Sequence, residues 1–335
     1  MTQLVGIARL AASAPSLLAK RRVEYFEMAS RSLLNRCSSE NVPFDWTINP
    51  YRGCEFGCQY CYARYTHEFL ELRDPLLFEQ RIYAKHFDAA AFRRELGRTR
   101  RGEIVALGTA TDPYQPAERR YRITCGILET LGATGALRVG LITKSDLVMR
   151  DVELLARVAE RHALRVDVTI TTLDARMARA LEPMAPTPAR RLEAVRALAS
   201  AGIRTGVNCC PVMPGFNDSE AQIGAVCEPA AEAGACSFHA SALFLRSPTR
   251  EHFLKFVERR DPKLAQRYKR MFPAHSDLRH PDPAAIAARV EAVRARCGLT
   301  ERGWFEPLKD GWPPEEQMSL FDVPADGIAG VPAPC

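Results

Sequence analysis

The sequence predicts an α/β fold: a partial (β/α)6 barrel of the TIM type with an N-terminal extension and a flexible C-terminal tail. Short apolar runs rich in β-branched residues alternate with amphipathic helical patterns, which favours a parallel sheet in an open or barrel-like arrangement. Polar residues also gather just after the expected strands, at the end of a parallel sheet where sites lie. Six strands are expected, over residues 46–49, 104–107, 139–143, 166–171, 205–211 and 237–245.

Helical patterns fill the spaces between these strands. Residues 151–162 carry apolar side chains on one face and begin at Asp151, a typical N-cap. Residues 188–201 repeat the pattern and stop at Gly202, and a further amphipathic helix is expected over residues 278–297. We therefore expect an N-terminal extension (1–45), a core barrel (46–275), a C-terminal helical segment (276–304) and a flexible tail (305–335).

Composition indicates a soluble globular protein. Of the 335 residues, 47% are hydrophobic and 26% charged, which suffices for a sizeable core. No apolar run approaches the roughly 20 residues of a membrane span, and the basic residues 20–22 follow the mildly apolar start, whereas a secretory signal has them in front. We expect a cytoplasmic protein without membrane contact. The net charge of +6 permits a nucleic-acid partner, or reflects arginines on solvated helix faces.

Three of the 11 cysteines are clustered, because Cys54, Cys58 and Cys61 follow a C-x3-C-x2-C spacing. An odd number of cysteines in a chain without an export signal makes a disulfide framework a poor explanation. Three thiolates in a short loop suit an iron–sulfur cluster or zinc. Structural zinc normally needs a fourth ligand, for which His67 is the only nearby candidate. On a cubane cluster, three thiolates leave one iron open for a substrate or cofactor.

This loop, at the end of the first strand of a βα repeat, resembles that of the radical S-adenosyl-L-methionine (SAM) superfamily. The resemblance implies an enzyme with a 4Fe-4S cluster on Cys54, Cys58 and Cys61, whose open iron chelates the amino and carboxylate groups of SAM. An electron from the cluster then splits the sulfonium to give a 5′-deoxyadenosyl radical. It also implies an electron donor such as flavodoxin or ferredoxin.

Further strings extend the resemblance over residues 46–250, towards the branch related to spore photoproduct lyase, which undoes a thymine dimer in DNA. Bacterial proteins labelled DNA repair photolyases are similar too. The strings of the lyase branch are GTATDPYQP at 108–116, TKS at 143–145 and the Glu182-Pro to Arg191 segment. The labelled bacterial proteins share the run through YTHE at 65–68.

One departure limits what this branch implies. In the lyase, a cysteine just ahead of a Ser-Asp pair supplies a hydrogen atom to the product radical, whereas residues 109–112 here contain no cysteine. Cys125, further along, is expected to be a core residue of the following helix. The generic radical chemistry is therefore implied, the dimer-splitting reaction is not, and catalytic residues stay unassigned.

The groups that SAM carries suggest partners among the polar residues after the strands. Lys144 and Arg191 (or Arg190) would pair with its carboxylate, because both side chains are cationic. Ser145 and Glu182 would hydrogen-bond its ribose or amine. Glu182 and Arg191 are also open to the plainer interpretation of an ordinary ion pair between helices.

Further contacts are expected from backbone and loop residues. Asp112 would orient the Thr109 end of its loop, the backbone of residues 211–215 would pack on adenine, and Tyr60 places a ring beside the third cysteine. The candidate cofactor contacts are thus Tyr60, Thr109, Asp112, Lys144, Ser145, Glu182 and Arg191.

The tail contains the pentapeptide QMSLF at residues 317–321. It resembles the segment by which bacterial polymerases and repair proteins dock on the sliding clamp. Leu320 and Phe321 would enter apolar pockets next to Met318, while Gln317 would hydrogen-bond at the entrance. The alternative is a short amphipathic patch that folds back on the barrel.

The leading hypothesis is a radical SAM enzyme, lyase-like or modifying, that acts on DNA or another nucleic acid in repair or modification, with a base flipped into the barrel. A second is a radical SAM enzyme that modifies a peptide or small molecule, although no cysteine-rich auxiliary region is present. A third is a non-enzymatic metal-binding, clamp-associated protein.

Overall fold

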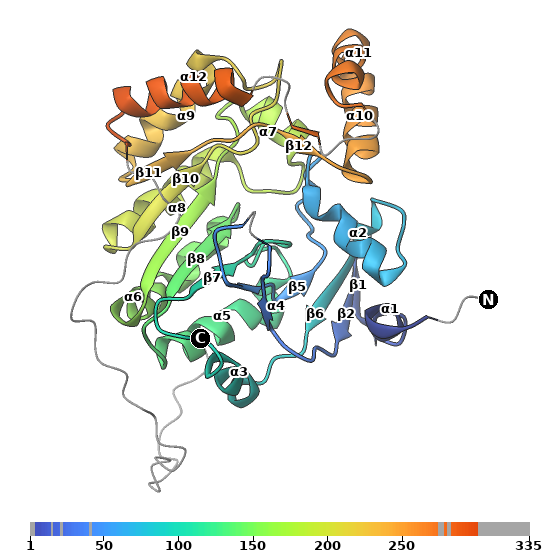
Figure 1. Cartoon of the computed structure of the whole chain (residues 1–335), viewed down its shortest axis with the longest axis vertical. Coiled ribbons are helices and arrows are strands. Elements are labelled where there is room, and N and C mark those ends of the chain that lie inside the picture. The colour runs from blue at the N-terminus through green and yellow to red at the C-terminus, as the bar shows by residue number, and fades with distance from the viewer. Residues whose placement is uncertain are drawn as a thin grey trace, which may run out of the picture.

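A seven-stranded sheet is the frame of the molecule (Figure 1). In this computed structural model, residues 4–14, 16–20, 23–39, 42–273, 278–279 and 283–300 are described. Six strands run parallel in chain order, and β3 pairs antiparallel at the edge. The order is β11 (Ser237–His239), β10 (Arg204–Asn208), β9 (Ala163–Thr169), β8 (Arg138–Thr143), β7 (Ile104–Leu107), β4 (Trp46–Ile48) and β3 (Leu34–Arg36). Among the described strands β11 does not pair with β3, so the sheet is open, and the predicted α/β fold with a parallel sheet is confirmed.

Three strands differ clearly from the prediction, among them β10, which ends at Asn208 rather than at residue 211. β9 begins at Ala163, three residues early, because the charged Arg165 and Asp167 interrupt the apolar run yet pair with each other inside the fold at 2.8 Å. The strand expected over 237–245 is split, since the chain bends after β11. Its remainder, β12 (Phe244–Leu245), pairs antiparallel with β13 (Leu278–Arg279).

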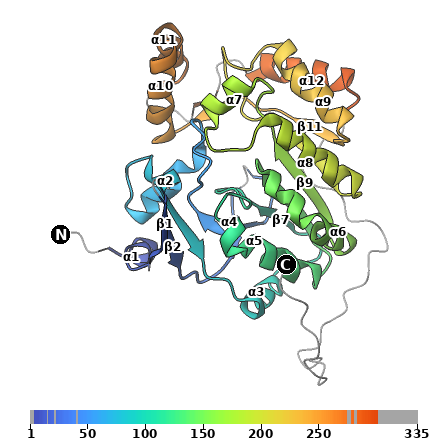
Figure 2. The same ribbon diagram turned by 180° about the vertical axis from the view of Figure 1, so that it is seen from behind.

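Helices cover the outer face of the sheet (Figure 2). Alternation along β9 turns Val166 and Val168 into the apolar core, where they join Leu155 and Leu198 from the covering helices. The polar residues between them face the other side. The covering helices are α3 (Ala89–Leu96), α5 (Ile123–Gly132), α6 (Val152–Arg161), α8 (Pro188–Ser200), α9 (Glu220–Glu232) and α12 (Pro283–Arg296).

The predicted stop signal of α8 is present in the structure, whereas the predicted N-cap of α6 is not. Thr187 caps α8 through the backbone N–H of Arg190, and Gly202 follows the helix with φ +75°. Asp151 makes no capping hydrogen bond to α6, because its carboxylate pairs with Arg150 at 2.7 Å.

The predicted N-terminal extension contributes strands to the main sheet and to a smaller, four-stranded sheet. Its β3 joins β4 in the main sheet. A smaller sheet has the order β1 (Ser16–Lys20), β2 (Val23–Met28), β6 (Arg81–Lys85) and β5 (Tyr51–Arg52), with α1 (Gly6–Ala12), η1 (Tyr62–Leu70) and α2 (Leu77–Gln80) beside it.

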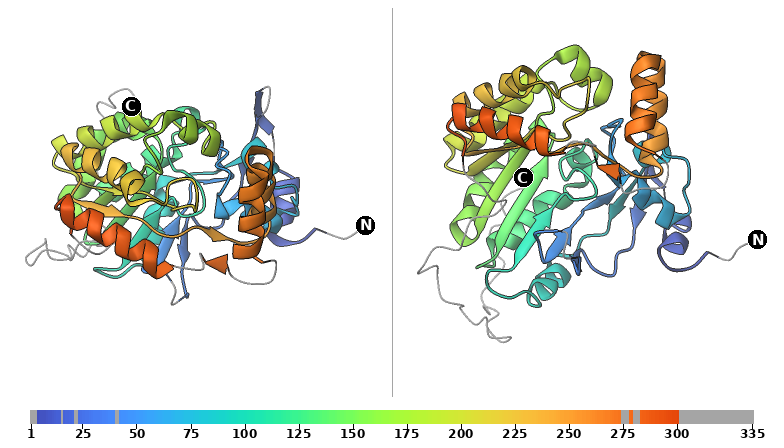
Figure 3. Two further views of the ribbon diagram at one scale, coloured as in Figure 1. Left: turned by 90° about the horizontal axis from the view of Figure 1, so that it is seen from above. Right: turned by 45° about the horizontal axis from the view of Figure 1, so that its top comes forward.

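The carboxyl ends of the parallel strands lie between two groups of helices (Figure 3). On one side lie α7 (Ala175–Leu181), α8, α9 and α12. On the other stands a helical hairpin of α10 (Thr249–Arg260) and α11 (Pro262–Met271). No helix within the described ranges is long and apolar enough to cross a membrane. The predicted clamp-binding residues Gln317, Met318, Leu320 and Phe321 lie outside the described residues.

Candidate functional site

The loop with the three clustered cysteines follows β4 and β5 and ends at η1. Cys54 and Cys58 are buried and Cys61 is half-buried, and all three are free thiols. Gly53 makes the tight approach possible, because its φ is +81° and a Cβ there would lie 2.7 Å from the Phe78 carbonyl oxygen. The Cys54 N–H donates to that same oxygen at 2.9 Å.

Residues after β7 hold the loop by its backbone. Thr111 Oγ1 and Gln115 Nε2 donate to the Gly53 carbonyl at 2.6 and 3.0 Å. The Glu55 N–H donates to Gln115 Oε1 at 3.0 Å. The loop therefore keeps its shape without engaging the thiols.

Two further side chains fix the second half of the loop. Arg64 is almost fully buried and donates to the Cys58 carbonyl at 3.0 Å and to Glu79 at 2.7 Å. Thr249, at the start of α10, donates to the Cys61 carbonyl at 2.7 Å. Arg64 is close in sequence and its role could have been guessed, whereas Thr249 is 188 residues away from Cys61.

His67, the possible fourth zinc ligand, is packed under the loop. Its Nε2 lies 3.0 Å from the Arg81 carbonyl oxygen, and its ring meets Phe78 edge-on with centroids 5.1 Å apart. Burial lowers the pKa of His67 to about 4. Within the part of the chain that the structure describes, no three His, Cys, Asp or Glu side chains lie close enough together to hold one metal ion.

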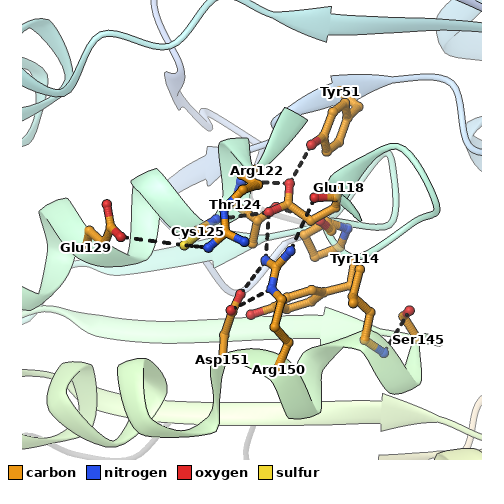
Figure 4. Close-up of polar contacts among 12 residues, drawn as sticks. Tyr51, Tyr114, Glu118, Arg122, Thr124, Cys125, Glu129, Ser145, Arg150 and Asp151 are labelled. Atoms are coloured by element: carbon orange, nitrogen blue, oxygen red, sulfur yellow. Dashed lines mark hydrogen bonds and ion pairs between the residues drawn. The ribbon is translucent and has the colours of Figure 1, made fainter. Parts of the chain in front are cut away.

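The buried carboxylate of Glu118 holds the segment that precedes the cysteine loop (Figure 4). The Tyr51 hydroxyl, just ahead of the loop, donates to Glu118, which is fully buried. Arg150 reaches Glu118 at 3.1 Å. The N–H groups of Thr124 and Cys125, at the start of α5, donate to it at 2.9 and 3.1 Å. Cys125 is 3% exposed and belongs to the core, as predicted.

Four of the predicted cofactor contacts meet beside Cys58. The Tyr60 hydroxyl donates to Glu182, and Arg191 forms an ion pair with Glu182 at 2.5 Å. Lys144 Nζ lies 5.7 Å from the centre of the Tyr60 ring. Burial alone would raise the pKa of Glu182, but Arg191 and Lys144 outweigh it and hold that pKa below its usual value. Glu182 is therefore an ionised carboxylate.

Lys144 and Arg191 differ in the number of polar partners that the protein gives them. Arg191 also donates to the carbonyl oxygens of Thr169 at 3.1 Å and Pro186 at 2.9 Å, so its guanidinium is fully engaged. Among the described residues no carboxylate lies within ion-pair distance of Lys144. The neighbouring Arg190 is half-exposed and pairs with Asp146 at 3.0 Å, at the surface.

The remaining predicted contacts hold the strand ends in place. Asp112 accepts from Thr143 Oγ1 and from the Lys144 N–H, both at 2.7 Å, and so joins the ends of β7 and β8. Ser145 Oγ accepts from the Leu147 N–H at 3.2 Å and so caps η2 (Asp146–Asp151). Thr109 Oγ1 accepts from the Asn49 side chain at 3.1 Å.

Two cavities adjoin this group. One of about 500 Å³ lies between α7 and α8 and is lined in part by Glu182 and Arg191. The other, of about 270 Å³, is lined in part by Phe56 of the cysteine loop, Tyr114 and Ser145. Both sides of the 182–191 segment therefore offer space for a small molecule.

Comparisons with known proteins agree with this arrangement. The family model described as the radical SAM superfamily matches residues 48–223. An uncharacterised protein of Mycobacterium tuberculosis is 34% identical over 305 residues, which are 90% of this chain and 88% of that protein. An uncharacterised protein of Methanocaldococcus jannaschii is 27% identical over 208 residues, 61% of this chain and 73% of its own. The solved structure of spore photoproduct lyase complexed with dinucleoside spore photoproduct has a similar fold, with a TM-score of 0.60, 16% identity, and 81% and 79% of the two chains covered.

Proposed function

Since this chain belongs to the radical SAM superfamily, whose enzymes use a 4Fe-4S cluster and SAM, we propose that Cys54, Cys58 and Cys61 hold the cluster and that the enzyme acts on a nucleic acid. The observation that carries the proposal is the preformed loop with three free thiols beside the buried Tyr60–Glu182–Arg191 group. Membership also implies an electron donor, for which flavodoxin or ferredoxin are candidates.

The donor set fits the cluster better than a single metal ion. A cubane bonds each thiolate to a different iron, so its ligands lie further apart than those of one zinc ion. The described residues offer no group of three ligands around one point, and His67 is held by the Arg81 carbonyl. The loop backbone is fixed by Gly53 and Arg64 contacts that leave the sulfur atoms free.

The residues beside Cys58 fit the polar groups of SAM. When bound, the cluster would supply the electron that reductive cleavage of SAM needs. Lys144 offers an ammonium to a carboxylate, because no carboxylate of the described chain pairs with it. Glu182, kept ionised by Arg191, offers acceptor oxygens to an amino group or to ribose hydroxyls, and Tyr60 fixes its orientation.

A basic surface beside the site supports a nucleic-acid substrate. The α10–α11 hairpin, which we call the basic hairpin, stands beside the carboxyl ends of the strands (Figure 3) and touches the cysteine loop through Thr249. Cationic side chains pair with phosphates without regard to sequence. The solved lyase of similar fold holds a dinucleoside photoproduct. The exposed cations of the hairpin are Lys255, Arg259, Arg260, Lys263, Arg267, Lys269 and Arg270.

The chemistry and the substrate are tested by one assay. Full-length protein, reconstituted anaerobically with iron and sulfide, is given dithionite and SAM, and 5′-deoxyadenosine is measured alone and with intact DNA, ultraviolet-damaged DNA or RNA. We expect 5′-deoxyadenosine, and more of it with damaged DNA. No product from protein with four bound irons would refute the chemistry. If 5′-deoxyadenosine formed but no nucleic acid increased its amount, the proposal of a nucleic-acid substrate would be refuted, and a peptide or small molecule would be favoured.

Removing charge from the basic hairpin is expected to weaken DNA binding. For the variant Lys263→Ala/Arg267→Ala/Arg270→Ala, the slope of log Kd against log salt should fall by about 3, since each phosphate contact contributes about 0.9. Fluorescence anisotropy with a labelled duplex measures this slope.

The matched control removes three arginines far from the basic hairpin. Arg93→Ala/Arg94→Ala/Arg100→Ala changes exposed residues around α3, at the opposite end of the molecule (Figure 1). Its salt slope should equal that of the wild type. Equal losses in the two variants would mean that the hairpin is not the binding surface.

A further inference from the structure

Two cationic side chains of the smaller sheet, those of Arg52 and Lys85, have no polar partner among the described residues. Arg52 ends β5, just before the cysteine loop, and Lys85 ends the neighbouring β6 (Figure 1). Lys85 is only 7% exposed, and the Nε atom of Arg52 is buried without a hydrogen bond. Within the part of the chain that the structure describes, no carboxylate lies within ion-pair distance of either side chain.

The strand pairing places both side chains on one face of the sheet. In the antiparallel pair of β5 and β6, Arg52 lies opposite Tyr83, and the Lys85 N–H donates to the Pro50 carbonyl at 3.1 Å. Lys85 is therefore the diagonal neighbour of Arg52 on the face that carries Tyr83. Long side chains in this position are within reach of each other. The two cationic groups therefore lie close together at one end of β5 and β6.

The charged groups around this pair do not neutralise it. Burial, and then the charge of Arg52, lower the pKa of Lys85 to about 7, and Glu95 of α3 opposes them less strongly. Glu95 is engaged elsewhere, because its carboxylate accepts hydrogen bonds from the 32–34 segment, each at 2.9 Å. Burial, and to a smaller degree Arg52, lower the pKa of His67 to about 4, so this neighbour on η1 carries no charge at neutral pH.

A buried cation beside a half-buried one is costly without an anion. Burial removes hydration from each charge, and like charges that lie close together repel each other. A bound anion offsets both effects. The guanidinium of Arg52 offers a fork of N–H donors and the ammonium of Lys85 a point charge, and both kinds of group bind phosphate oxygens. The pair therefore has the chemistry of a phosphate site.

Aromatic side chains beside the pair suit the bases of a nucleic acid. Burial lowers the pKa of Arg52, and Tyr65 of η1 lies near enough to oppose this effect. The Arg246 guanidinium lies 4.2 Å from the centre of the Tyr65 ring. Phe69 is 57% exposed and meets Tyr65 edge-on, with centroids 5.8 Å apart. Bases of any sequence stack on aromatic rings, and arginine adds cation–π attraction.

We propose that Arg52 and Lys85 bind a backbone phosphate of the nucleic-acid substrate and so hold the strand beside the cysteine loop. This inference rests on the proposed function, because it identifies where that substrate meets the site. Arg52 lies two residues before Cys54, so a phosphate held there keeps the strand close to the loop. The base next to this phosphate has the rings of Tyr65 and Phe69 to stack on.

Lys85→Met tests the site, because methionine fills a similar space without a charge. Full-length reconstituted protein is titrated, without SAM, into a labelled short single-stranded oligonucleotide, and fluorescence anisotropy gives Kd at several salt concentrations. We expect the variant to bind at least about tenfold more weakly, because a phosphate loses a charge-assisted hydrogen bond. The slope of log Kd against log salt should fall by about 0.7, the contribution of one phosphate on a single strand.

Free phosphate and a matched variant identify what the site binds. Inorganic phosphate, compared with chloride at equal ionic strength, should raise the Tm of the wild type by about 1–2 °C and leave that of Lys85→Met unchanged. Without phosphate, Lys85→Met should be at least as stable as the wild type, because it removes a buried charge that lacks a counter-ion. Arg157→Met is the control, since Arg157 is an exposed cation on α6, and it should bind the strand as the wild type does.

Arg52→Gln gives an independent measure and should weaken strand binding in the same way. If Lys85→Met and Arg52→Gln both bound the strand as tightly as the wild type, the proposal would be overturned. It would also be overturned if free phosphate stabilised only the wild type while strand binding stayed unchanged, because the pair would then be a site for a small anion. Binding requires neither SAM nor a reductant, so this failure is distinct from a failure to form 5′-deoxyadenosine, which would refute the proposed chemistry.

Discussion

A Cys58→Ala variant is expected to hold less than half of the iron of the wild type after anaerobic reconstitution and to form 5′-deoxyadenosine at least about 1,000-fold more slowly. A methyl group cannot bind iron, and a cluster that has lost one of three protein thiolates also loses the geometry that leaves one iron open. Iron per chain, visible absorption and product formed with dithionite and SAM are the three measurements.

Cys125→Ala is the matched control for this loss. Cys125 is as buried as Cys58 but lies on α5, where its thiol faces Arg122 and Glu129 rather than the loop. It should keep the iron and the turnover of the wild type. If Cys58→Ala retained full iron and turnover, the loop would not be the cluster site. If both variants lost iron equally, general destabilisation would explain the result.

The parallel sheet was predictable because its strands bury β-branched residues on the face that packs against helices. In β9 this signal comes from Val166 and Val168. The start of the strand could not be predicted, because Arg165 looks like a surface residue in the sequence, and its ion pair with Asp167 forms only in the folded chain. The pairing of β2 with β6 joins residues 57 apart in sequence, such as Glu24 and Arg81. No local pattern encodes such a contact, so the first 45 residues could be predicted only as an extension.

The parts of the site that could be predicted are those whose residues lie close together in the sequence. Three cysteines within eight residues predict a cluster site. The groups that support the loop come from distant segments, such as Thr249 on α10, and could not be predicted. Glu182 and Arg191 allowed two interpretations, a cofactor contact or an ion pair, and the structure places the ion pair within the site itself.

Breaking the Glu182–Arg191 pair is expected to be the most destabilising single change at the site. Arg191→Met should lower the free energy of unfolding by about 3–5 kcal/mol, because it leaves a buried carboxylate without its cation. The loss is expected to depend on pH. In the wild type the depressed pKa of Glu182 contributes stability above the unfolded-state pKa of about 4.3, and this contribution is lost as the pH falls through the folded-state pKa. The cost of Arg191→Met should therefore be largest near neutral pH and shrink as Glu182 is protonated.

Urea denaturation at pH 8 and pH 5 measures this cost, and two further variants identify its source. Arg190→Met, on the adjacent residue, removes a half-exposed arginine from surface ion pairs and should cost far less than Arg191→Met. Adding Glu182→Gln to Arg191→Met should recover part of the loss, because the amide carries no charge to leave unpaired. If Arg191→Met cost no more than Arg190→Met, the buried pair would not stabilise the fold. If the double variant were as unstable as the single one, the lost contacts of Arg191 to the Thr169 and Pro186 carbonyls, rather than the unpaired charge, would account for the cost.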